Sequence, residues 1–338
     1  MKFIKVMIAA SLIVPLASFF LADADWTRRT HAIGTSLGEN KYGLYLASVR
    51  AEILNDTPAL EDFYAQAAEQ NGGDFLGRLF ILDALAGREN EAADRARQSL
   101  AENRGGVIPA LYLAVGEFRK QNFAEASKLL GDIKGPDGAP TRSFAVRLFR
   151  GWTLMAEGKM DAAISLLDDD ADNMAFEKTA LVHLAWMAEL AGKQDYAAEL
   201  WGEAAAYWLD ASEAKAAVDF YMRRGDRAKA LSLMENFRVK APSSVSFQML
   251  SKKVGEDGYE PDTAPTPSQG FARALFEIAN GILSLNRFDT ADVYALYLDM
   301  ALSLEPDMDI ALLMRADAYR RSGNMEKFEE TAAKIPAS

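Results

Sequence analysis

The sequence predicts an all-α protein built as a tandem array of antiparallel helix hairpins. Three observations lead to this fold class: an internal repeat with a constant period, a glycine in the middle of each repeat, and apolar residues at helical spacing on both sides of that glycine. Gly158, Gly192 and Gly225 follow one another at nearly equal intervals. The same intervals recur for alanine at Ala163, Ala197 and Ala230.

The first residues have the pattern of an export signal. Residues 1–24 combine a basic start, an apolar run and the small-x-small sequence Ala22-Asp23-Ala24. The apolar run is shorter than the ~20 residues that a membrane-spanning helix needs. We therefore expect a cleaved signal at 1–24, a mature chain starting near Asp25 and a lead-in over 25–40. The alternative is an uncleaved amino-terminal anchor.

Residues 41–254 are expected to form consecutive helix hairpins. Each unit has a first apolar-periodic stretch, a glycine-centred break and a second stretch that starts with small residues. The clearest units are 147–167, 181–201 and 215–234, and weaker ones are 41–71, 74–103 and 107–133. Small residues at the start of the second helix let the two backbones approach closely, which favours a tight hairpin.

A change of composition interrupts the array at residues 255–270, a short stretch that holds three prolines and three glycines. This composition is typical of a flexible connector. Helical periodicity resumes at Phe271 and continues over 271–338, where we expect further hairpins and about eight in the whole chain.

The repeats resemble the tetratricopeptide repeat (TPR), whose unit is about 34 residues long. The matching residues are a small residue in the first helix (Gly151, Ala185), an aromatic near its end (Tyr221, Tyr319), the alanine of the second helix (Ala126, Ala163, Ala197, Ala230) and a closing proline (Pro242, Pro306). Val218 departs from the first of these. The layout is similar to that of exported bacterial TPR proteins. The resemblance implies a right-handed superhelical solenoid whose first helices line a concave groove that binds protein segments.

We predict the residues of that partner-binding groove from the repeat registers. Trp152 and Trp186 are one repeat apart, and Val115 and Asp219 take the equivalent place in neighbouring units. The full set predicted for the groove is Val115, Phe118, Arg119, Trp152, Met155, Trp186, Glu189, Met222 and Arg223. An aromatic and Met-rich trough suits a segment of another protein. The alternative is that the tryptophans are core residues and that the groove is more polar.

Composition excludes several classes of function. The chain has no cysteine, two histidines and a net charge of −12. The absence of cysteine excludes disulfides and thiolate metal sites, and the acidic balance argues against nucleic-acid binding. We expect no metal and no cofactor. His183, on an otherwise apolar helix, is interpreted as a core residue, and it is the main titratable lead for a third alternative, an enzyme with a helical active site.

Together these features predict a non-catalytic periplasmic TPR scaffold or adaptor that binds segments of partner proteins, in cell-envelope assembly or proteolysis. The alternative is an inner-membrane-anchored assembly factor that retains its amino-terminal segment, and only this alternative involves the membrane. The last hairpin has no successor in the sequence, which suggests self-association or a partner surface there.

Overall fold

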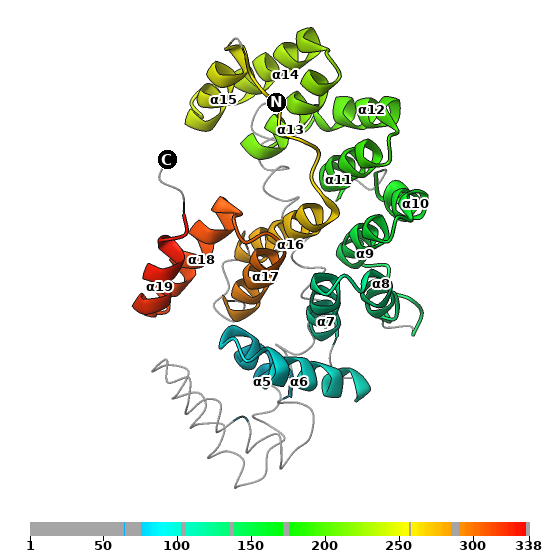
Figure 1. Cartoon of the computed structure of the whole chain (residues 1–338), viewed down its shortest axis with the longest axis vertical. Coiled ribbons are helices and arrows are strands. Elements are labelled where there is room, and N and C mark those ends of the chain that lie inside the picture. Colours follow the sequence, from blue (N-terminus) through cyan, green and yellow to red (C-terminus); the bar gives the residue numbers. More distant parts are fainter. Residues whose placement is uncertain are drawn as a thin grey trace, which may run out of the picture. The chain divides into compact units, whose positions relative to one another are not determined.

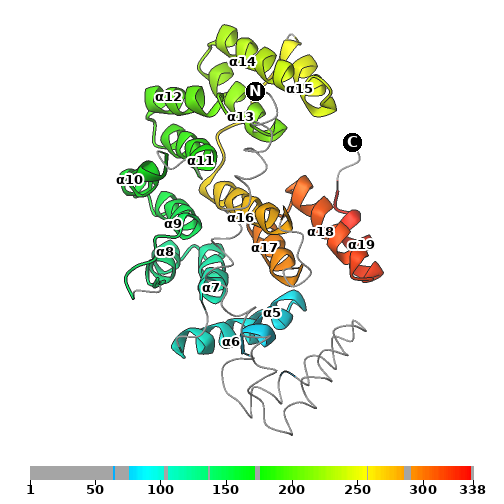
Figure 2. The ribbon, with the colours of Figure 1, turned by 180° about the vertical axis from the view of Figure 1, so that it is seen from behind.

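The computed structural model describes residue 64 and residues 76–102, 106–135, 138–171, 176–256, 258–284 and 291–335 (Figures 1 and 2). Over these ranges the chain is helical, and its one β-type contact is an isolated bridge between Lys134 and Pro140. No helix in this part of the chain is long and apolar enough to span a lipid bilayer. The predicted signal and the lead-in lie outside the described residues, as does the hairpin at 41–71 except for Tyr64.

The helices follow one another in hairpins, as the period predicts. In chain order they are α5 (Leu76–Leu85), α6 (Glu89–Ala101), α7 (Val107–Arg119), α8 (Phe123–Gly131), α9 (Phe144–Ala156), α10 (Met160–Ala171), α11 (Glu177–Leu190), α12 (Gln194–Ala204), α13 (Ala211–Arg223), α14 (Arg227–Lys240), α15 (Val245–Gly255), α16 (Pro267–Ser284), α17 (Ala291–Leu304), α18 (Asp309–Arg321) and α19 (Met325–Ala332).

Six hairpins of the described chain share one kind of connection, in which three residues separate the helices and the middle residue has a positive φ. In α11–α12 the amide of Gly192 donates to the carbonyl of Glu189, and the amide of Lys193 donates to that of Ala188. This pair of bonds is a Schellman closure, which needs a left-handed residue that glycine adopts without steric cost. The equivalent residues are Gly87, Gly158, Gly192, Gly225 and Gly323, with Gln121 in α7–α8.

Alanines allow the close packing inside each hairpin. Ala163, Ala197 and Ala230, the recurring alanines of the second helices, have no exposed surface. A larger side chain at these positions would push the two helices apart, because the interior is close-packed. The alanine period is therefore a packing requirement, and the hairpin prediction is confirmed.

The described chain divides into two compact units. One is continuous and runs from Leu154 to Gly270; the other combines the residues up to Thr153 with Phe271–Ser338. We call them the continuous unit and the discontinuous unit.

The discontinuous unit joins helices from the two ends of the chain. Figures 1 and 2 both show α17 beside α5 and α7, and these helices are in contact. An ion pair joins Arg78 of α5 to Asp292 of α17, with 2.5 Å between Nη1 and Oδ2. Lys327 of α19 donates to the carbonyl of Leu85 at 3.2 Å. These contacts hold the carboxyl-terminal helices on the first described hairpin.

An aromatic cluster buries the inner side of α7. Phe271 of α16 has no exposed surface; its ring centroid lies 5.2 Å from that of Phe118 and 5.6 Å from that of Phe149. The first contact is edge-to-face, the arrangement that aromatic rings prefer. The side of α7 that the sequence predicts as a partner groove is therefore covered by the chain's own helix α16.

The break between the two arrays differs from its predicted limits. The helix α15 ends at Gly255, where the predicted break starts, whereas α16 begins at Pro267 rather than at Phe271. Thr266 accepts a bond from the amide of Gln269, whose side-chain oxygen accepts one from the amide of Thr266. This capping box, followed by proline at the first helical position, starts the helix early.

Candidate functional site

The structure buries the apolar residues of the predicted groove. Val115, Phe118, Trp152, Met155 and Trp186 are each at most 5% exposed. Trp186 lies edge-on to Trp201 of its own hairpin, with 5.9 Å between centroids. The prediction of an open aromatic and Met-rich trough is therefore wrong, because the first helices bury these side chains as core. The alternative of tryptophans in the core and a more polar face describes the structure.

Among the polar members of the predicted groove, the two arginines are at least partly accessible, whereas the side chain of Glu189 is largely buried. Arg119 is exposed and forms an ion pair with Glu89. Arg223 of α13 donates from Nε and Nη2 to Oε1 of Glu189 on α11, at 3.0 and 2.8 Å. Met222, beside Arg223, is partly exposed. A role in partner binding stays a prediction for Arg119, Glu189, Met222 and Arg223.

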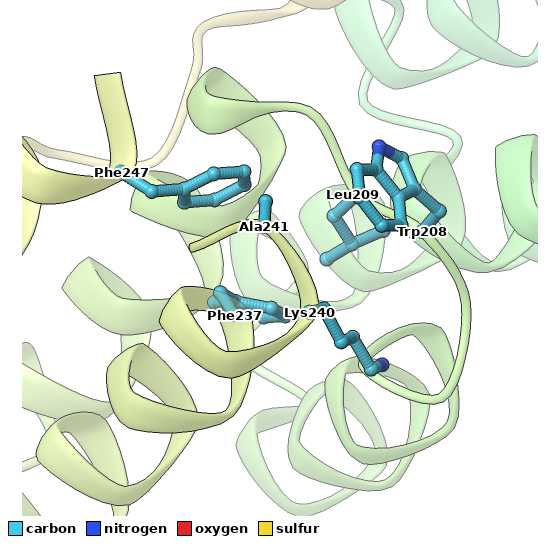
Figure 3. A pocket seen from close by; sticks show the side chains of 6 residues that line it. All are labelled: Trp208, Leu209, Phe237, Lys240, Ala241 and Phe247. Atoms are coloured by element: carbon cyan, nitrogen blue, oxygen red, sulfur yellow. The ribbon is translucent and has the colours of Figure 1, made fainter. Parts of the chain in front are cut away.

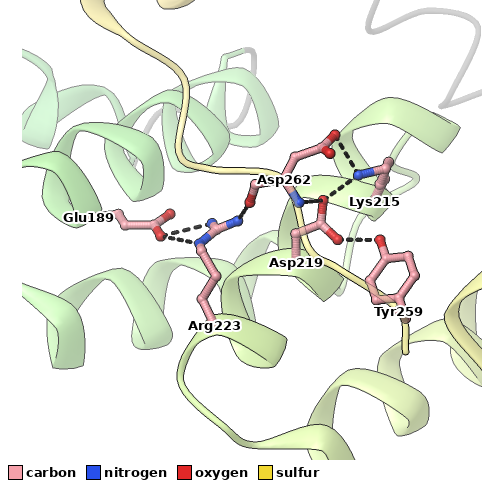
Figure 4. Close-up of polar contacts among 6 residues, drawn as sticks. All are labelled: Glu189, Lys215, Asp219, Arg223, Tyr259 and Asp262. Carbon is pink, nitrogen blue, oxygen red and sulfur yellow. Dashed lines mark hydrogen bonds and ion pairs between the residues drawn. The ribbon is translucent and has the colours of Figure 1, made fainter. Parts of the chain in front are cut away.

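An extended segment of the chain lies against the helices that carry the Glu189–Arg223 pair. Residues 258–262, which we call the strap, belong to the connection between α15 and α16 (Figure 4). The main-chain carbonyl of Asp262 accepts a bond from Arg223, and its amide donates to Oδ2 of Asp219 at 3.2 Å. The face thus holds the strap by its backbone as well as by its side chains.

Side chains of the strap complete the contact. The hydroxyl of Tyr259 donates to Oδ1 of Asp219, and the carboxylate of Asp262 accepts from Nζ of Lys215 at 2.6 Å. Lys215 also donates to Oδ2 of Asp219 and lies 6.0 Å from the centroid of the Tyr259 ring. Glu189, Lys215, Asp219 and Arg223 form what we call the α11–α13 face (Figure 4). The expectation of a flexible connector missed these contacts.

Three residues of the α11–α13 face are one helical turn apart along α13. Lys215, Asp219 and Arg223 follow at intervals of four residues, which places them on one side of the helix. A capping box fixes the start of α13: Oδ1 of Asp210 accepts from the amide of Glu213 at 2.8 Å, and the amide of Asp210 donates to Glu213 at 2.7 Å. The helix therefore presents the three side chains in a fixed register.

Asp219 is the centre of the face and could have been recognised from the sequence. It takes the repeat position of Trp152 and Trp186, and its side chain is 3% exposed. A carboxylate at a core position needs hydrogen-bond donors, since an unpaired buried charge is costly. Lys215, Tyr259 and the amide of Asp262 supply them.

Burial and pairing shift the pKa values of three side chains at the site. Burial, together with the hydrogen bond to Asp219, raises the pKa of Tyr259 to about 12. Burial raises the pKa of Glu189 above its usual value, opposed by the positive charge of Arg223. Burial lowers the pKa of Lys215, but its bonds to Asp219 and Asp262 outweigh this and raise it overall. At neutral pH Tyr259 is thus a donor and Lys215 a cation.

A small pocket lies elsewhere in the continuous unit (Figure 3). It is lined by Trp208, Leu209, Phe237, Lys240, Ala241 and Phe247, and it has no room for even one water molecule. Lys240 donates to the carbonyls of Ala205, Ala206 and Tyr207 at the end of α12, so its role there is to cap a helix.

The histidine that the sequence offers as a titratable lead is a core residue. His183 has no exposed surface and lies edge-on to Trp186, with 5.2 Å between centroids, as expected of a core histidine. Among the residues that the structure describes, no group of three or more His, Asp or Glu side chains is placed to hold a metal ion. The site that the structure does present is a surface that holds an extended peptide segment.

The hairpin geometry gives the described chain a TPR-like all-α fold, built from antiparallel helix hairpins in each of the two units. Three solved structures are similar to it at low identity. Naa15/Naa10 bound to HypK-THB is 12% identical, with 85% of this chain and 51% of that chain covered and a TM-score of 0.40. The APC/C hetero-tetramer Cut9-Hcn1 is 13% identical, with 90% of this chain and 68% of that chain covered and a TM-score of 0.36. The P58(IPK) TPR domain is 14% identical, with 96% of this chain and 90% of that chain covered and a TM-score of 0.25.

This chain spans about half the length of the first of these structures, 51%. No protein-family model matches the sequence, and no curated protein matches it. The fold assignment therefore rests on the repeat and the hairpins of this chain itself.

Proposed function

We propose that the protein is a non-catalytic scaffold that binds extended segments of partner proteins. The observation that carries this proposal is the strap: the α11–α13 face holds residues 258–262 through both main-chain and side-chain bonds. A surface that binds one extended segment through its backbone has the chemistry to bind others, as in other modes of peptide recognition.

The rigidity of the face supports this function. Two hydrogen bonds to Glu189 fix the rotamer of Arg223. Its remaining guanidinium nitrogen, Nη1, therefore has a defined position from which it donates to a carbonyl group. Fixed donors lose little entropy when a ligand binds, and they select a ligand with the matching spacing.

We also propose that the protein acts in the periplasm, in cell-envelope assembly or proteolysis. Support comes from the export pattern of residues 1–24. Amino-terminal sequencing of the protein recovered from cells tests this part. A start near Asp25 is expected; a start at Met1 in a membrane fraction would instead favour the anchored assembly factor.

Site-specific photo-cross-linking in cells tests the scaffold function. A photoreactive residue at Met222, beside Arg223 on the partly exposed edge of the face, is expected to give discrete adducts with other proteins. Val239, which is 64% exposed on α14, is the matched control and is expected to give none. Equal adduct patterns at the two positions, or no adducts at Met222, would contradict the proposal.

A further inference from the structure

We infer that the strap is a built-in competitor for the α11–α13 face, and that the partner segment which displaces it is extended, acidic and carries tyrosine three residues before aspartate. This inference rests on the proposed scaffold function and specifies its ligand. In the strap this pattern is Tyr259-Glu260-Pro261-Asp262.

Competition follows from the bonds that the strap uses. Asp219 receives Tyr259 on one oxygen and the amide of Asp262 on the other, while Lys215 and Arg223 bind the carboxylate and the carbonyl of Asp262. A second segment cannot reach these groups until the strap leaves. Asp219, buried and then left with fewer donors, would favour a replacement that supplies the same hydroxyl and amide.

The spacing of the face defines the ligand. A hydroxyl donor has to reach Oδ1 of Asp219, while three residues later a carboxylate has to reach Lys215 and a carbonyl has to reach Arg223. Proline at the intervening position favours the extended backbone that these contacts require. Glu260, between the contacting residues, is exposed, which leaves its place free to vary.

The strap leaves part of the face unused. Oε1 of Glu189 accepts both bonds from Arg223, whereas Oε2 is buried and has no hydrogen-bond partner within the described structure. The side chain of Glu189 is 9% exposed, so this oxygen is poorly hydrated. A partner segment that offers one more N–H donor beside the carbonyl held by Arg223 would satisfy it, and would therefore bind better than the strap does.

Exposure and irregular backbone structure both favour displacement of the strap by a partner segment. Its Asp262 side chain is 76% exposed, and the strap lies within a coil connection that ends where α16 begins at Pro267. A tethered segment has an effective concentration on the order of millimolar, and the apparent Kd of a competing ligand is its intrinsic Kd divided by the fraction of time that the face is uncovered.

Peptide binding to the full-length protein tests the inference. The probe is a fluorescently labelled synthetic peptide with the sequence of residues 258–266, followed by anisotropy. The strap variant Tyr259→Ala/Asp262→Ala is expected to bind the peptide at least about tenfold more tightly than the unaltered protein. The milder variant Tyr259→Phe, which keeps the ring, is expected to give a smaller gain in the same direction.

Two control variants show whether a change in peptide affinity comes from the contacts between the strap and the face. Glu260→Ala removes one negative charge from the same strap without removing a described contact, and should leave the affinity unchanged. Lys215→Ala/Arg223→Ala in the strap variant should abolish binding while circular dichroism remains helical. Equal affinity of the strap variant and the unaltered protein would overturn the inference, as would binding that survives loss of Lys215 and Arg223.

Failure of this inference is distinct from failure of the scaffold function. Adducts at Met222 together with equal peptide affinities would leave the scaffold in place and remove the competing strap. Tighter binding by the strap variant without adducts in cells would confirm the competitor and contradict the scaffold role.

Discussion

Arg223 forms an ion pair with Glu189, the residue 34 positions before it, with 2.8 Å between Nη2 and Oε1. The separation is one residue longer than the local repeat, in which Gly225 follows Gly192 by 33 positions, so the pair joins nearly equivalent parts of neighbouring hairpins. The period of the sequence thus becomes a contact between α11 and α13, and the same guanidinium also holds the strap.

Removing Arg223 is expected to destabilise the protein. Arg223→Ala leaves the buried carboxylate of Glu189 without its donor, which costs about 2 kcal/mol of unfolding free energy. Urea denaturation measures the change. Arg238→Ala is the matched control, because its pair with Glu235 is exposed on α14, and no measurable change is expected there. Similar effects of the two substitutions would show that the Glu189–Arg223 pair adds nothing to stability.

The hairpin connections make a prediction of opposite sign at two positions. Gln121 has φ 64 where the other hairpins have glycine, so Gln121→Gly should stabilise the protein by about 1 kcal/mol. Gly192→Ala, at φ 73, should destabilise it by about as much. Thermal unfolding measures both changes.

Gly202→Ala distinguishes the effect of φ from that of an added methyl group. This glycine lies inside α12 with an ordinary helical φ and open space at its Cβ. Alanine there should stabilise the helix by about 0.5 to 1 kcal/mol. A loss of stability at Gly202 equal to that at Gly192 would contradict the conformational explanation.

The two kinds of tryptophan should respond differently to truncation. Trp152→Ala removes a fully buried indole and should cost about 3–5 kcal/mol through the cavity it leaves. Trp208→Ala, at a side chain that is 64% exposed, should cost less than about 1 kcal/mol. Denaturant unfolding compares them. A small effect at Trp152 would mean that its side chain is not part of the core.

The hydroxyl of Tyr259 should lose its proton at a higher pH than that of an ordinary tyrosine. Its pKa is raised from 10.0 to about 12, so the contribution of its bond to Asp219 is complete below pH 10 and is lost as the pH rises through about 12. The tyrosinate absorbance of the unaltered protein minus that of Tyr259→Phe isolates this group. Asp262→Ala, which loosens the strap, should move the midpoint back toward 10. A midpoint near 10 in the unaltered protein would contradict the buried bond.

The repeat made the local fold predictable, because a period of glycine and alanine reports backbone conformation and close packing. Gly192 and Ala197 occupy the positions that such a period predicts. The residues of the site could not be predicted from the repeat in the same way. The same period that places Trp186 in a first helix cannot tell whether neighbouring elements bury it, since burial depends on contacts distant in sequence.

The strap shows the second limit. Proline and glycine in residues 255–270 indicate a connection without regular structure, and such a composition carries no information about what the connection touches. The informative residue was Asp219, a carboxylate at the position where two neighbouring repeats have tryptophan. A charge at a core position predicts a polar partner, and Tyr259 and Asp262 are that partner.

The discontinuous unit has a consequence for how the polypeptide reaches its native state. Contacts such as Arg78–Asp292 and Lys327–Leu85 join residues more than 200 positions apart, so they form only after synthesis has passed residue 291. The continuous unit, from Leu154 to Gly270, is uninterrupted in sequence and can fold first. The early helices would meanwhile expose Phe118 and Phe149 until α16 is available to cover them.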